Sequence, residues 1–490
     1  MSLFLPFFYN KEKLLRRFSP AAEPEHTAKY THRHQPDGSE NASEREVKMS
    51  SYVTRKTPGD TAWFTHDRFG MFIHFGLYAL PARHEWIKTR EEIPEEKYDL
   101  YFKHFNPDLC DPRDWARQAK AAGMKYAVLT TKHHEGFCLF DSKYTDYKST
   151  NTPCGRDLVR EYVDAFRAEG LRVGFYYSLI DWHHPEFPID LHHPRRDDPD
   201  AFEKSKGRDM KKYAQYMRDQ VTELLTNYGK IDILWFDFSY SDYNGTGDRA
   251  WMRGKGKDDW EAEKLIDLVR SLQPDIIIDN RTEIDQDLWT PEQYQPTQWM
   301  THPETGELVT WEACQTFSGS WGYYRDEQTW KSPEMLIRML VNTVSCGGNL
   351  LMNVGPTGRG YLDYRAEEAL QVYADWMKYN SRSIYGCTMA EPEFTAPADC
   401  RYTQSMDGSR LYLHLFAYPF AHLRLPGMGG RVEYAQFLHD ASEVLFTEGQ
   451  IDHFSAKNEK GDSNDLILYL PPVKPHTLVP VIELFLKQEK

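Results

Sequence analysis

The sequence predicts an α/β fold in which a (β/α)8-like barrel of seven or eight strands is followed by a C-terminal β-sandwich. Between about residues 63 and 380, short apolar runs rich in β-branched and aromatic residues alternate with amphipathic helical segments. This alternation implies parallel strands joined by helical crossovers, and the number of repeats favours a closed or nearly closed barrel. A doubly wound open sheet is the alternative. Beyond residue 386, short alternating segments split by turns indicate an all-β domain.

The individual elements follow from their periodicity and end signals. The helices expected at 111–122 and 156–168 are each followed by a glycine, Gly123 and Gly170, a common helix stop. Barrel strands are predicted at 69–74, 125–131, 171–178, 231–237, 275–281, 308–314 and 348–354, and further helices at 209–228, 260–272, 333–345 and 365–380. Sandwich strands are predicted at 401–405, 410–417, 432–438, 465–470 and 479–485.

These elements divide the chain into three parts. Residues 1–59 are expected to form an N-terminal extension, because most of this stretch is polar and shows no sustained periodicity. Residues 60–388 contain the predicted catalytic barrel, and residues 389–490 the sandwich. A chain of 490 residues is long enough for one large domain and one smaller domain.

Charge and cysteine content exclude several classes of protein. The formal net charge of −15 argues against a nucleic-acid partner, because phosphate binding needs a basic surface. Aromatic residues make up 14% of the chain, which suits a ligand with flat, weakly polar faces. The seven cysteines are an odd number and contain no CxxC pair, which indicates free thiols in a reducing compartment.

No stretch is apolar for long enough to cross a bilayer, so we expect no membrane partner. The apolar start, Met1 to Phe8, is followed by basic residues, whereas a secretory signal has the opposite order. We therefore expect a cytoplasmic protein. The sequence leaves the oligomeric state open, a homo-oligomer included.

The segment 231–237 carries the first candidate for chemistry. Side chains alternate along a strand, so Ile231, Ile233, Trp235 and Asp237 are expected to share one face, with the carboxylate at the C-terminal tip. In parallel α/β barrels, catalytic groups lie at the C-terminal ends of strands. Asp237 is therefore either a glycosidase nucleophile beside a tryptophan that stacks on a sugar, or an aspartate that caps the following loop.

Further polar and aromatic side chains are expected near the same strand ends: His74, Glu85, Trp86, His133, His134, Tyr176 and Arg281. Such groups bind either a metal ion or the hydroxyls of a neutral ligand. His133 and His134 are adjacent on an apparent strand and should point to opposite faces, and no HExxH motif occurs, so we expect no metal site. The turn at 355–360 lacks the Lys-Ser/Thr of a phosphate loop.

Several motifs occur together along residues 60–386: Gly70–Tyr78, Glu85-Trp86, Thr131–Phe137, Gly174–Ser178, Leu234–Asp237, Asn280-Arg281, Thr290–Glu292, Trp311-Glu312 and Asn349–Pro356. By their content and order, the sequence resembles the α-L-fucosidases of glycoside hydrolase family 29. Two positions depart from the usual pattern of that family. Phe75 stands where tryptophan is usual, and Glu135 where aspartate is usual, both beside the expected ligand contacts.

The resemblance implies a retaining exo-α-L-fucosidase that removes terminal α-linked L-fucose from oligosaccharides or glycoconjugates without a cofactor. It implies that Asp237 is the nucleophile and forms a fucosyl-enzyme. The fucose pocket would be lined by His74, Glu85, Trp86, His133, His134, Tyr176, Trp235 and Arg281. It also implies that the barrel is followed by a β-sandwich.

Three glutamates are candidates for the acid/base. Glu292 matches the loop acid of the family and is the preferred choice. Glu312, at the sixth predicted strand, is the second candidate, with substrate contact or orientation as its expected role. Glu283 is expected to lie near Arg281, whose charge would hold it ionised and make it a poor acid.

Two other classes of protein stay open at this point. A lectin-like relative would bind fucose without hydrolysing it, and a metal-dependent barrel hydrolase would lose activity in EDTA. The polar insertion at 243–257 directly follows the nucleophile strand and is expected to shape the aglycone side of the site.

Overall fold

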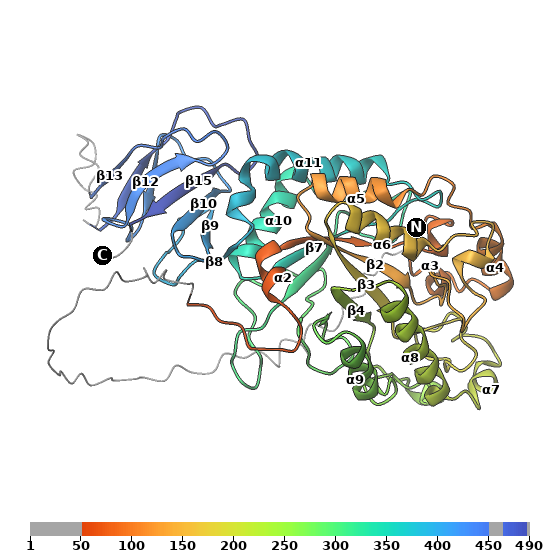
Figure 1. Ribbon diagram of the computed structural model, residues 1–490. Coiled ribbons are helices and arrows are strands. Elements are labelled where there is room, and N and C mark those ends of the chain that lie inside the picture. Colours follow the sequence, from red (N-terminus) through yellow and green to blue (C-terminus); the bar gives the residue numbers. More distant parts are fainter. Residues whose placement is uncertain (1–50, 450–463, 488–490) are drawn as a thin grey trace, which may run out of the picture. The chain divides into compact units, whose positions relative to one another are not determined.

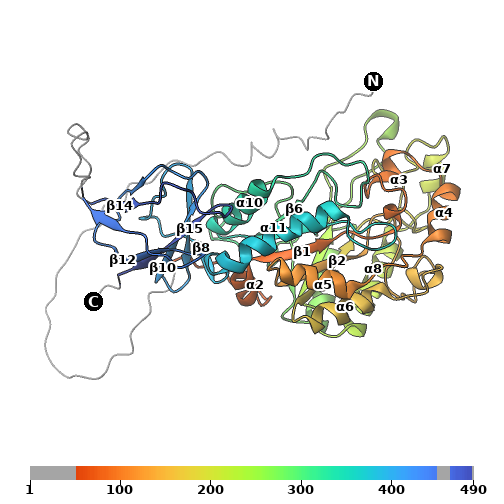
Figure 2. The ribbon, with the colours of Figure 1, turned by 90° about the horizontal axis from the view of Figure 1, so that it is seen from above.

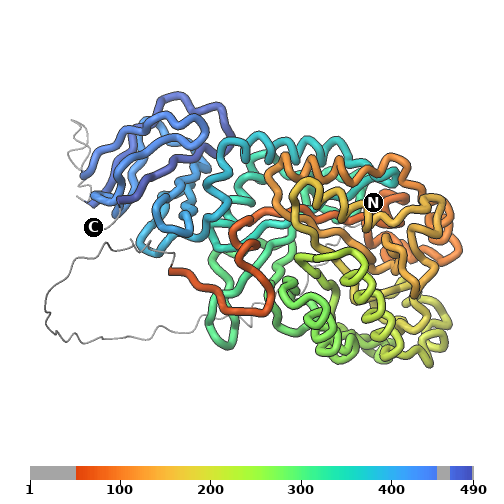
Figure 3. Tube along the Cα trace, in the orientation of Figure 1, coloured from red at the N-terminus to blue at the C-terminus, as the bar shows by residue number. Residues whose placement is uncertain are grey.

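The computed structural model describes residues 51–449 and 464–487, and within these ranges the strands form three sheets. A curled parallel sheet of seven strands has the order β5-β4-β3-β2-β1-β7-β6 (Figure 1). The chain passes through this sheet once before it enters the C-terminal strands, as the colours of the trace show (Figure 3). The predicted α/β architecture with a C-terminal β domain is confirmed.

The strands of the parallel sheet are β1 (Phe69–Ile73), β2 (Tyr126–Lys132), β3 (Arg172–Ser178), β4 (Ile233–Asp237), β5 (Ile277–Ile278), β6 (Glu312–Thr316) and β7 (Asn349–Val354). The helices are α2 (Ala62–Asp67), α3 (Ile87–Arg90), α4 (Glu95–His104), α5 (Pro112–Ala121), α6 (Leu158–Ala168), α7 (Ala201–Ser205), α8 (Met210–Asn227), α9 (Ala262–Leu272), α10 (Pro333–Ser345) and α11 (Tyr364–Asn380). All seven predicted strands and the six predicted helices are present, and most of their ends lie within two residues of the prediction.

The eighth position of the barrel is filled by an irregular segment, residues 288–292. Single parallel bridges join Leu288 to Asp279 after β5, Trp289 to Trp311 before β6, and Glu292 to Cys314 within β6. This segment therefore lies between the two edge strands and completes the ring. No strand pattern is visible in this part of the sequence, because Pro291 interrupts any regular ladder of backbone hydrogen bonds.

Alternation along the strands separates an inner from an outer core. Ile233 and Trp235 belong to a small cluster with Phe72 and Tyr176 inside the curled sheet. Ile231 instead packs in the outer cluster between sheet and helices, because it precedes the regular part of β4. The expectation that Ile231 shares the face of Asp237 is therefore wrong.

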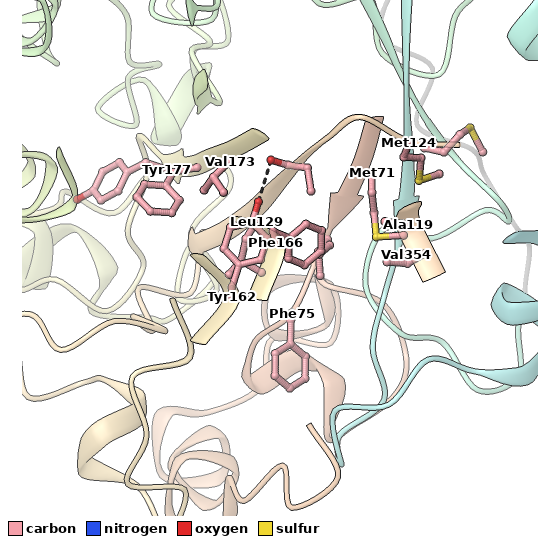
Figure 4. Packing of buried hydrophobic residues seen from close by; sticks show 14 of the residues in the cluster. Met71, Phe75, Ala119, Met124, Leu129, Tyr162, Phe166, Val173, Tyr177 and Val354 are labelled. Carbon is pink, nitrogen blue, oxygen red and sulfur yellow. Dashed lines mark hydrogen bonds between the residues drawn. The ribbon is translucent and has the colours of Figure 1, made fainter. Parts of the chain in front are cut away.

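The outer core lies between the sheet and the surrounding helices. Leu129 of β2, Val173 and Tyr177 of β3, and Tyr162 and Phe166 of α6 are buried together in it (Figure 4). Several helices start where an aspartate or serine accepts a hydrogen bond from a backbone N–H of the first turn: Asp111, Asp157, Asp209, Ser332 and Asp363. These side chains satisfy backbone donors that the helix itself leaves free. Helix α4 was not predicted, because Tyr98 is its one fully buried residue and it has no apolar stripe.

The C-terminal strands form a five-stranded antiparallel sheet of order β12-β15-β10-β9-β8 and a three-stranded sheet of order β11-β14-β13. Their bounds are β8 (Cys387–Met389), β9 (Cys400–Ser405), β10 (Arg410–Leu415), β11 (His422–Leu425), β12 (Val432–Phe437), β13 (Phe446–Glu448), β14 (Leu466–Tyr469) and β15 (Val481–Leu486). Helices α10 and α11 lie beside these strands (Figure 2). The Trp376 indole N–H of α11 donates to the carbonyl of Leu478 at 2.9 Å.

Three sequence expectations concern the chain as a whole. Residues 1–50 of the predicted extension lie outside the described residues, whereas Arg55 forms an ion pair with Asp285 of the barrel. All seven cysteines are free thiols, and six of them are buried. In residues 51–449 and 464–487, no helix is both long and apolar enough to span a membrane.

Gly70 of β1 offers a test of the inner packing. A Cβ at this position would overlap the ring of Tyr126, which is buried inside the sheet. We expect Gly70→Ala to lower the free energy of unfolding by about 1–3 kcal/mol, because the barrel interior cannot expand to accept the methyl group. Urea unfolding followed by tryptophan fluorescence measures this change. Gly358→Ala is the control, since the nearest atom to its Cβ would be 3.3 Å away, and an equal loss in both variants would contradict the interpretation.

Candidate active site

Asp237 ends β4, and both of its carboxylate oxygens accept hydrogen bonds. The Tyr176 hydroxyl of β3 donates to Oδ2 at 2.8 Å, and Arg281 Nη1 donates to Oδ1 at 2.9 Å. The register partner of Asp237 on β3 is Ser178, and Tyr176 precedes it by two residues. The carboxylate is therefore held from both neighbouring strands, with its side chain 14% exposed.

The electrostatic surroundings set the charge of Asp237. Burial raises the pKa of Asp237 to about 6, Arg281 opposes this shift, and the nearby charge of Glu292 adds to it. At neutral pH the carboxylate is therefore ionised. An ionised carboxylate at a strand tip that keeps some exposure has the charge that a nucleophile needs.

Arg281 connects Asp237 to the irregular eighth segment. Its Nε donates to Thr290 Oγ1 at 2.9 Å, and its Nη2 donates to the Thr290 carbonyl at 3.1 Å. Its Nη1 also donates to Glu292 Oε2 at 2.8 Å, and the guanidinium lies over the Trp235 ring at 4.6 Å. Burial lowers the pKa of Arg281, but the charges of Glu292 and Asp237 together raise it well above its usual value, so the guanidinium stays charged.

Three histidines lie around Tyr176 and Asp237 as neutral rings. Burial is the main cause that lowers their pKa values, to about 4 for His74 and well below the usual value for His133 and His134. His74 Nδ1 is hydrogen-bonded to Asn353 at 2.6 Å, and His134 Nδ1 to the Ser178 hydroxyl at 2.7 Å. Neutral imidazoles both donate and accept, which suits the hydroxyls of a sugar.

The expectation that His133 and His134 point to opposite faces is wrong. Their ring centroids are 3.9 Å apart, because β2 ends at Lys132 and the chain turns, with the Gly136 N–H donating to the His133 carbonyl. His134 Nε2 lies 3.9 Å from Asp237 Oδ2. Among residues 51–449 and 464–487, no group of three or more histidine, cysteine or acidic side chains is arranged to hold a metal ion.

Several buried polar atoms around the site lack hydrogen-bond partners within the described chain, Trp235 Nε1 among them, and two of these atoms belong to an imidazole and a carboxylate. One is His133 Nδ1 and the other is Glu85 Oε1. His84 Nδ1 lies 3.1 Å from Glu85 Oε1 but already accepts from the Trp86 N–H, so it cannot donate to the carboxylate. Buried polar groups are normally paired, so these two atoms are free to pair with a polar ligand.

Aromatic rings complete the walls. The Trp86 ring lies 5.0 Å from His134, and the Tyr176 ring is stacked on Trp235 at 5.9 Å. Trp321, which the sequence analysis missed, lies 5.2 Å from His74. No periodic signal marks Trp321, because it stands in an irregular loop. Asn353, also missed, is the polar residue within the apolar part of β7, and that exception to the pattern could have identified it.

The three candidate glutamates occupy different places. Glu292 shares Arg281 with Asp237 and is 41% exposed. Glu283 does not pair with Arg281 as expected, and its carboxylate accepts from the N–H groups of Ser241 at 3.3 Å and Lys257 at 3.2 Å. It therefore holds the loop that follows the nucleophile strand.

Glu312 lies at the start of β6 and is fully buried. Its carboxyl accepts from the Tyr126 hydroxyl and lies next to the Trp235 indole, and burial raises its pKa to about 8. The substrate contact predicted for Glu312 would therefore have to be made through Trp235.

Comparisons with known proteins agree with this geometry. The sequence model of a family described as Alpha-L-fucosidase matches residues 35–382. The plasma alpha-L-fucosidase of Homo sapiens is 30% identical over 397 residues, which cover 73% of this chain and 76% of that protein.

Solved structures give the same result. Alpha-L-fucosidase isoenzyme 1 from Paenibacillus thiaminolyticus has a TM-score of 0.79 and 45% identity, and covers 87% of this chain and 99% of its own. A family 29 alpha-L-fucosidase from Bacteroides thetaiotaomicron, trapped as a covalent intermediate, has a TM-score of 0.72 and 26% identity, and covers 90% of this chain and 99% of its own.

Proposed function

This chain belongs to the α-L-fucosidase family, and we propose that Asp237 is its nucleophile and Glu292 its acid/base. The protein is a retaining glycoside hydrolase that removes α-linked L-fucose from fucosylated glycans. The relative from Bacteroides thetaiotaomicron forms a covalent intermediate with a fluorinated fucosyl fluoride, as expected for a double displacement.

One observation carries the assignment of the two carboxylates. Asp237 Oδ1 and Glu292 Oε2 both accept from the same nitrogen, Arg281 Nη1, at 2.9 and 2.8 Å. These two oxygens cannot be further apart than the two distances taken together. Inverting enzymes keep their two carboxyl groups ~6.5–9.5 Å apart, so that an attacking water fits between them. The limit found here is shorter, so no such water fits between Asp237 and Glu292.

The reaction follows from this arrangement. Asp237 attacks the anomeric carbon while the glycosidic C–O bond breaks, and the proton on Glu292 passes to the leaving oxygen. For this step Glu292 has to leave Arg281, which its position on an exposed loop segment allows. In the second step Glu292 takes a proton from water, the water oxygen attacks the same carbon, and Asp237 is released.

Recognition of fucose rests on the buried end of the pocket. The unpartnered Glu85 Oε1 and His133 Nδ1 are placed to bind sugar hydroxyls, together with the neutral His74 and His134. Buried groups of this kind discriminate strongly, since an analogue that lacks a hydroxyl leaves them unpaired. Trp321 adds an apolar surface beside His74, which suits the C6 methyl group.

Location and assembly are the remaining parts of the proposal. A cytoplasmic location is supported by the seven free cysteines, which fit a reducing compartment. Cell fractionation tests this proposal. Size-exclusion chromatography with light scattering tests whether the chain forms a homo-oligomer.

The nucleophile assignment predicts the effect of Asp237→Ala. We expect this variant to lose about 1,000-fold or more of the activity on an aryl α-L-fucoside, because no group can form the fucosyl-enzyme. The assay contains EDTA. If the protein were a metal-dependent hydrolase, the wild type would already be inactive under these conditions. A wild type that binds fucose without hydrolysing it would indicate the lectin-like alternative, and an active Asp237→Ala would refute the assignment.

The acid/base assignment predicts a dependence on the leaving group. Glu292→Gln should lower kcat/KM for a fucosyl disaccharide by about 100-fold to 10,000-fold, because the sugar oxygen needs a proton. The same substitution should lower kcat/KM for α-L-fucosyl fluoride much less, because fluoride leaves without receiving a proton. Glu283→Gln is the matched control, since Glu283 contacts backbone N–H groups of a loop and should not show this selectivity.

The pKa of Asp237 predicts the acidic side of the pH profile. Since burial raises this pKa to about 6, kcat/KM for fucosyl fluoride should fall as the pH drops through about 6 and Asp237 becomes protonated. Glu292→Gln removes a cause that raises this pKa and should shift the fall to lower pH. Arg281→Gln removes a cause that lowers it and should shift the fall to higher pH. Shifts in the same direction would contradict the electrostatic interpretation.

A further inference from the structure

A chain of aromatic rings leads from the catalytic pocket to the protein surface. We call Trp86, Phe238, His192 and Tyr243 the rim aromatics. The Phe238 ring lies 5.0 Å from His134, 4.9 Å from Trp86 and 5.0 Å from His192, and the His192 ring is stacked on Tyr243 at 4.8 Å. These residues come from the loops after β1, β3 and β4.

Exposure increases along the rim aromatics with distance from the nucleophile. His134, beside Asp237, is buried, whereas Trp86, Phe238 and His192 are partly exposed. At the outer end, Tyr243 is 46% exposed. The rim aromatics therefore run from beside Asp237 to solvent.

Backbone conformation directs the inner end of this chain of rings. Phe238 directly follows Asp237 and has a φ of 83°. Residues other than glycine rarely adopt this region, and such positions are kept where the surroundings fix them for a function. The chain leaves β4 in this conformation. It places the Phe238 ring against Trp86 and His192.

Ion pairs and hydrogen bonds hold the outer loops in place. Lys255 pairs with Asp190 at 3.4 Å, and both side chains are almost fully buried. Arg249 pairs with Asp197, which ties the insertion at 243–257 to the loop after β3. The Thr89 hydroxyl donates to the His192 carbonyl at 2.7 Å, which joins the loop after β1. A surface held in this way loses little conformational entropy when a ligand binds.

The rim aromatics form a weakly polar surface. Burial lowers the pKa of His192, with Arg196 and Lys255 acting in the same direction and Asp190 opposing them, so the ring is neutral. The flat apolar faces of neutral aromatic rings match the flat C–H face of a pyranose.

We propose that Tyr243 and His192, with Phe238 behind them, form the binding site for the sugar to which fucose is linked. This inference rests on the proposed function. It identifies the leaving group of the hydrolysis as a pyranose. The polar sites for fucose lie at the buried end, beside Glu85 and His133, so the second sugar of the substrate lies outside them. The insertion at 243–257 takes part by carrying Tyr243.

The test compares two substrates that share fucose and differ in the leaving group. α-L-Fucosyl fluoride releases a single atom that cannot reach Tyr243, whereas a fucosyl disaccharide releases a pyranose. Tyr243→Ala should lower kcat/KM for the disaccharide by roughly 3-fold to 10-fold and leave the fluoride unchanged. Tyr243→Phe keeps the ring and should behave like the wild type.

Two further variants make the outcome decisive. His192→Ala should reproduce the selective loss, and combining it with Tyr243→Ala should add little, because the two rings act as one stack. Tyr364→Ala, at an exposed tyrosine at the start of α11, should change neither substrate. Equal effects on both substrates, or none in either rim variant, would overturn the rim site. A wild type inactive on fucosyl fluoride would instead overturn the proposed function.

Discussion

The active site depends on one guanidinium. Arg281 donates from a single nitrogen to Asp237 and Glu292, and its other nitrogens fix Thr290. These three partners stand on the two parts of the barrel that have the least regular hydrogen bonding, the tip of β4 and the eighth segment. The planar, charged guanidinium has N–H groups in fixed directions and can join these partners where backbone hydrogen bonds do not. The Arg281 side chain therefore takes the place of sheet hydrogen bonds at the edge where the barrel closes.

Asp279 joins the strand ends at the same edge of the sheet. β5 pairs with β4 over two residues, and beyond them Asp279 Oδ1 accepts from the Phe236 N–H at 3.3 Å and the Arg281 N–H at 3.4 Å. Burial raises the pKa of Asp279 well above its usual value, although the charge of Arg281 opposes this shift. The raised pKa weakens the competition of Asp279 with Asp237 for Arg281, while its Oδ1 still fixes the strand ends.

Sequence reasoning reached the regular parts of this molecule and stopped at the irregular ones. The strand ending at Asp237 was predictable, because alternation and an apolar run are properties of neighbouring residues. The pairing of His133 with His134 was not, since it depends on a turn that starts one residue after β2. Glu292 was identified through family motifs, yet its place in the barrel is set by single bridges to β6, which leave no period in the sequence. Trp321 is brought into the pocket by a loop, and only tertiary contacts reveal it.

The same division separates the two halves of the substrate site. In the proposed site, fucose meets groups at strand ends or close to them, such as His74 and Tyr176, which are buried in the barrel. The leaving sugar meets the rim aromatics, which stand on loops that are held by Lys255, Asp190 and Glu283 rather than by the sheet. Changes in loop length or sequence can therefore alter the second sugar without moving Asp237 or Arg281. On this fold, recognition of fucose and choice of its partner sugar are mechanically separate, and the loop after β4 joins them because Phe238 follows the nucleophile directly.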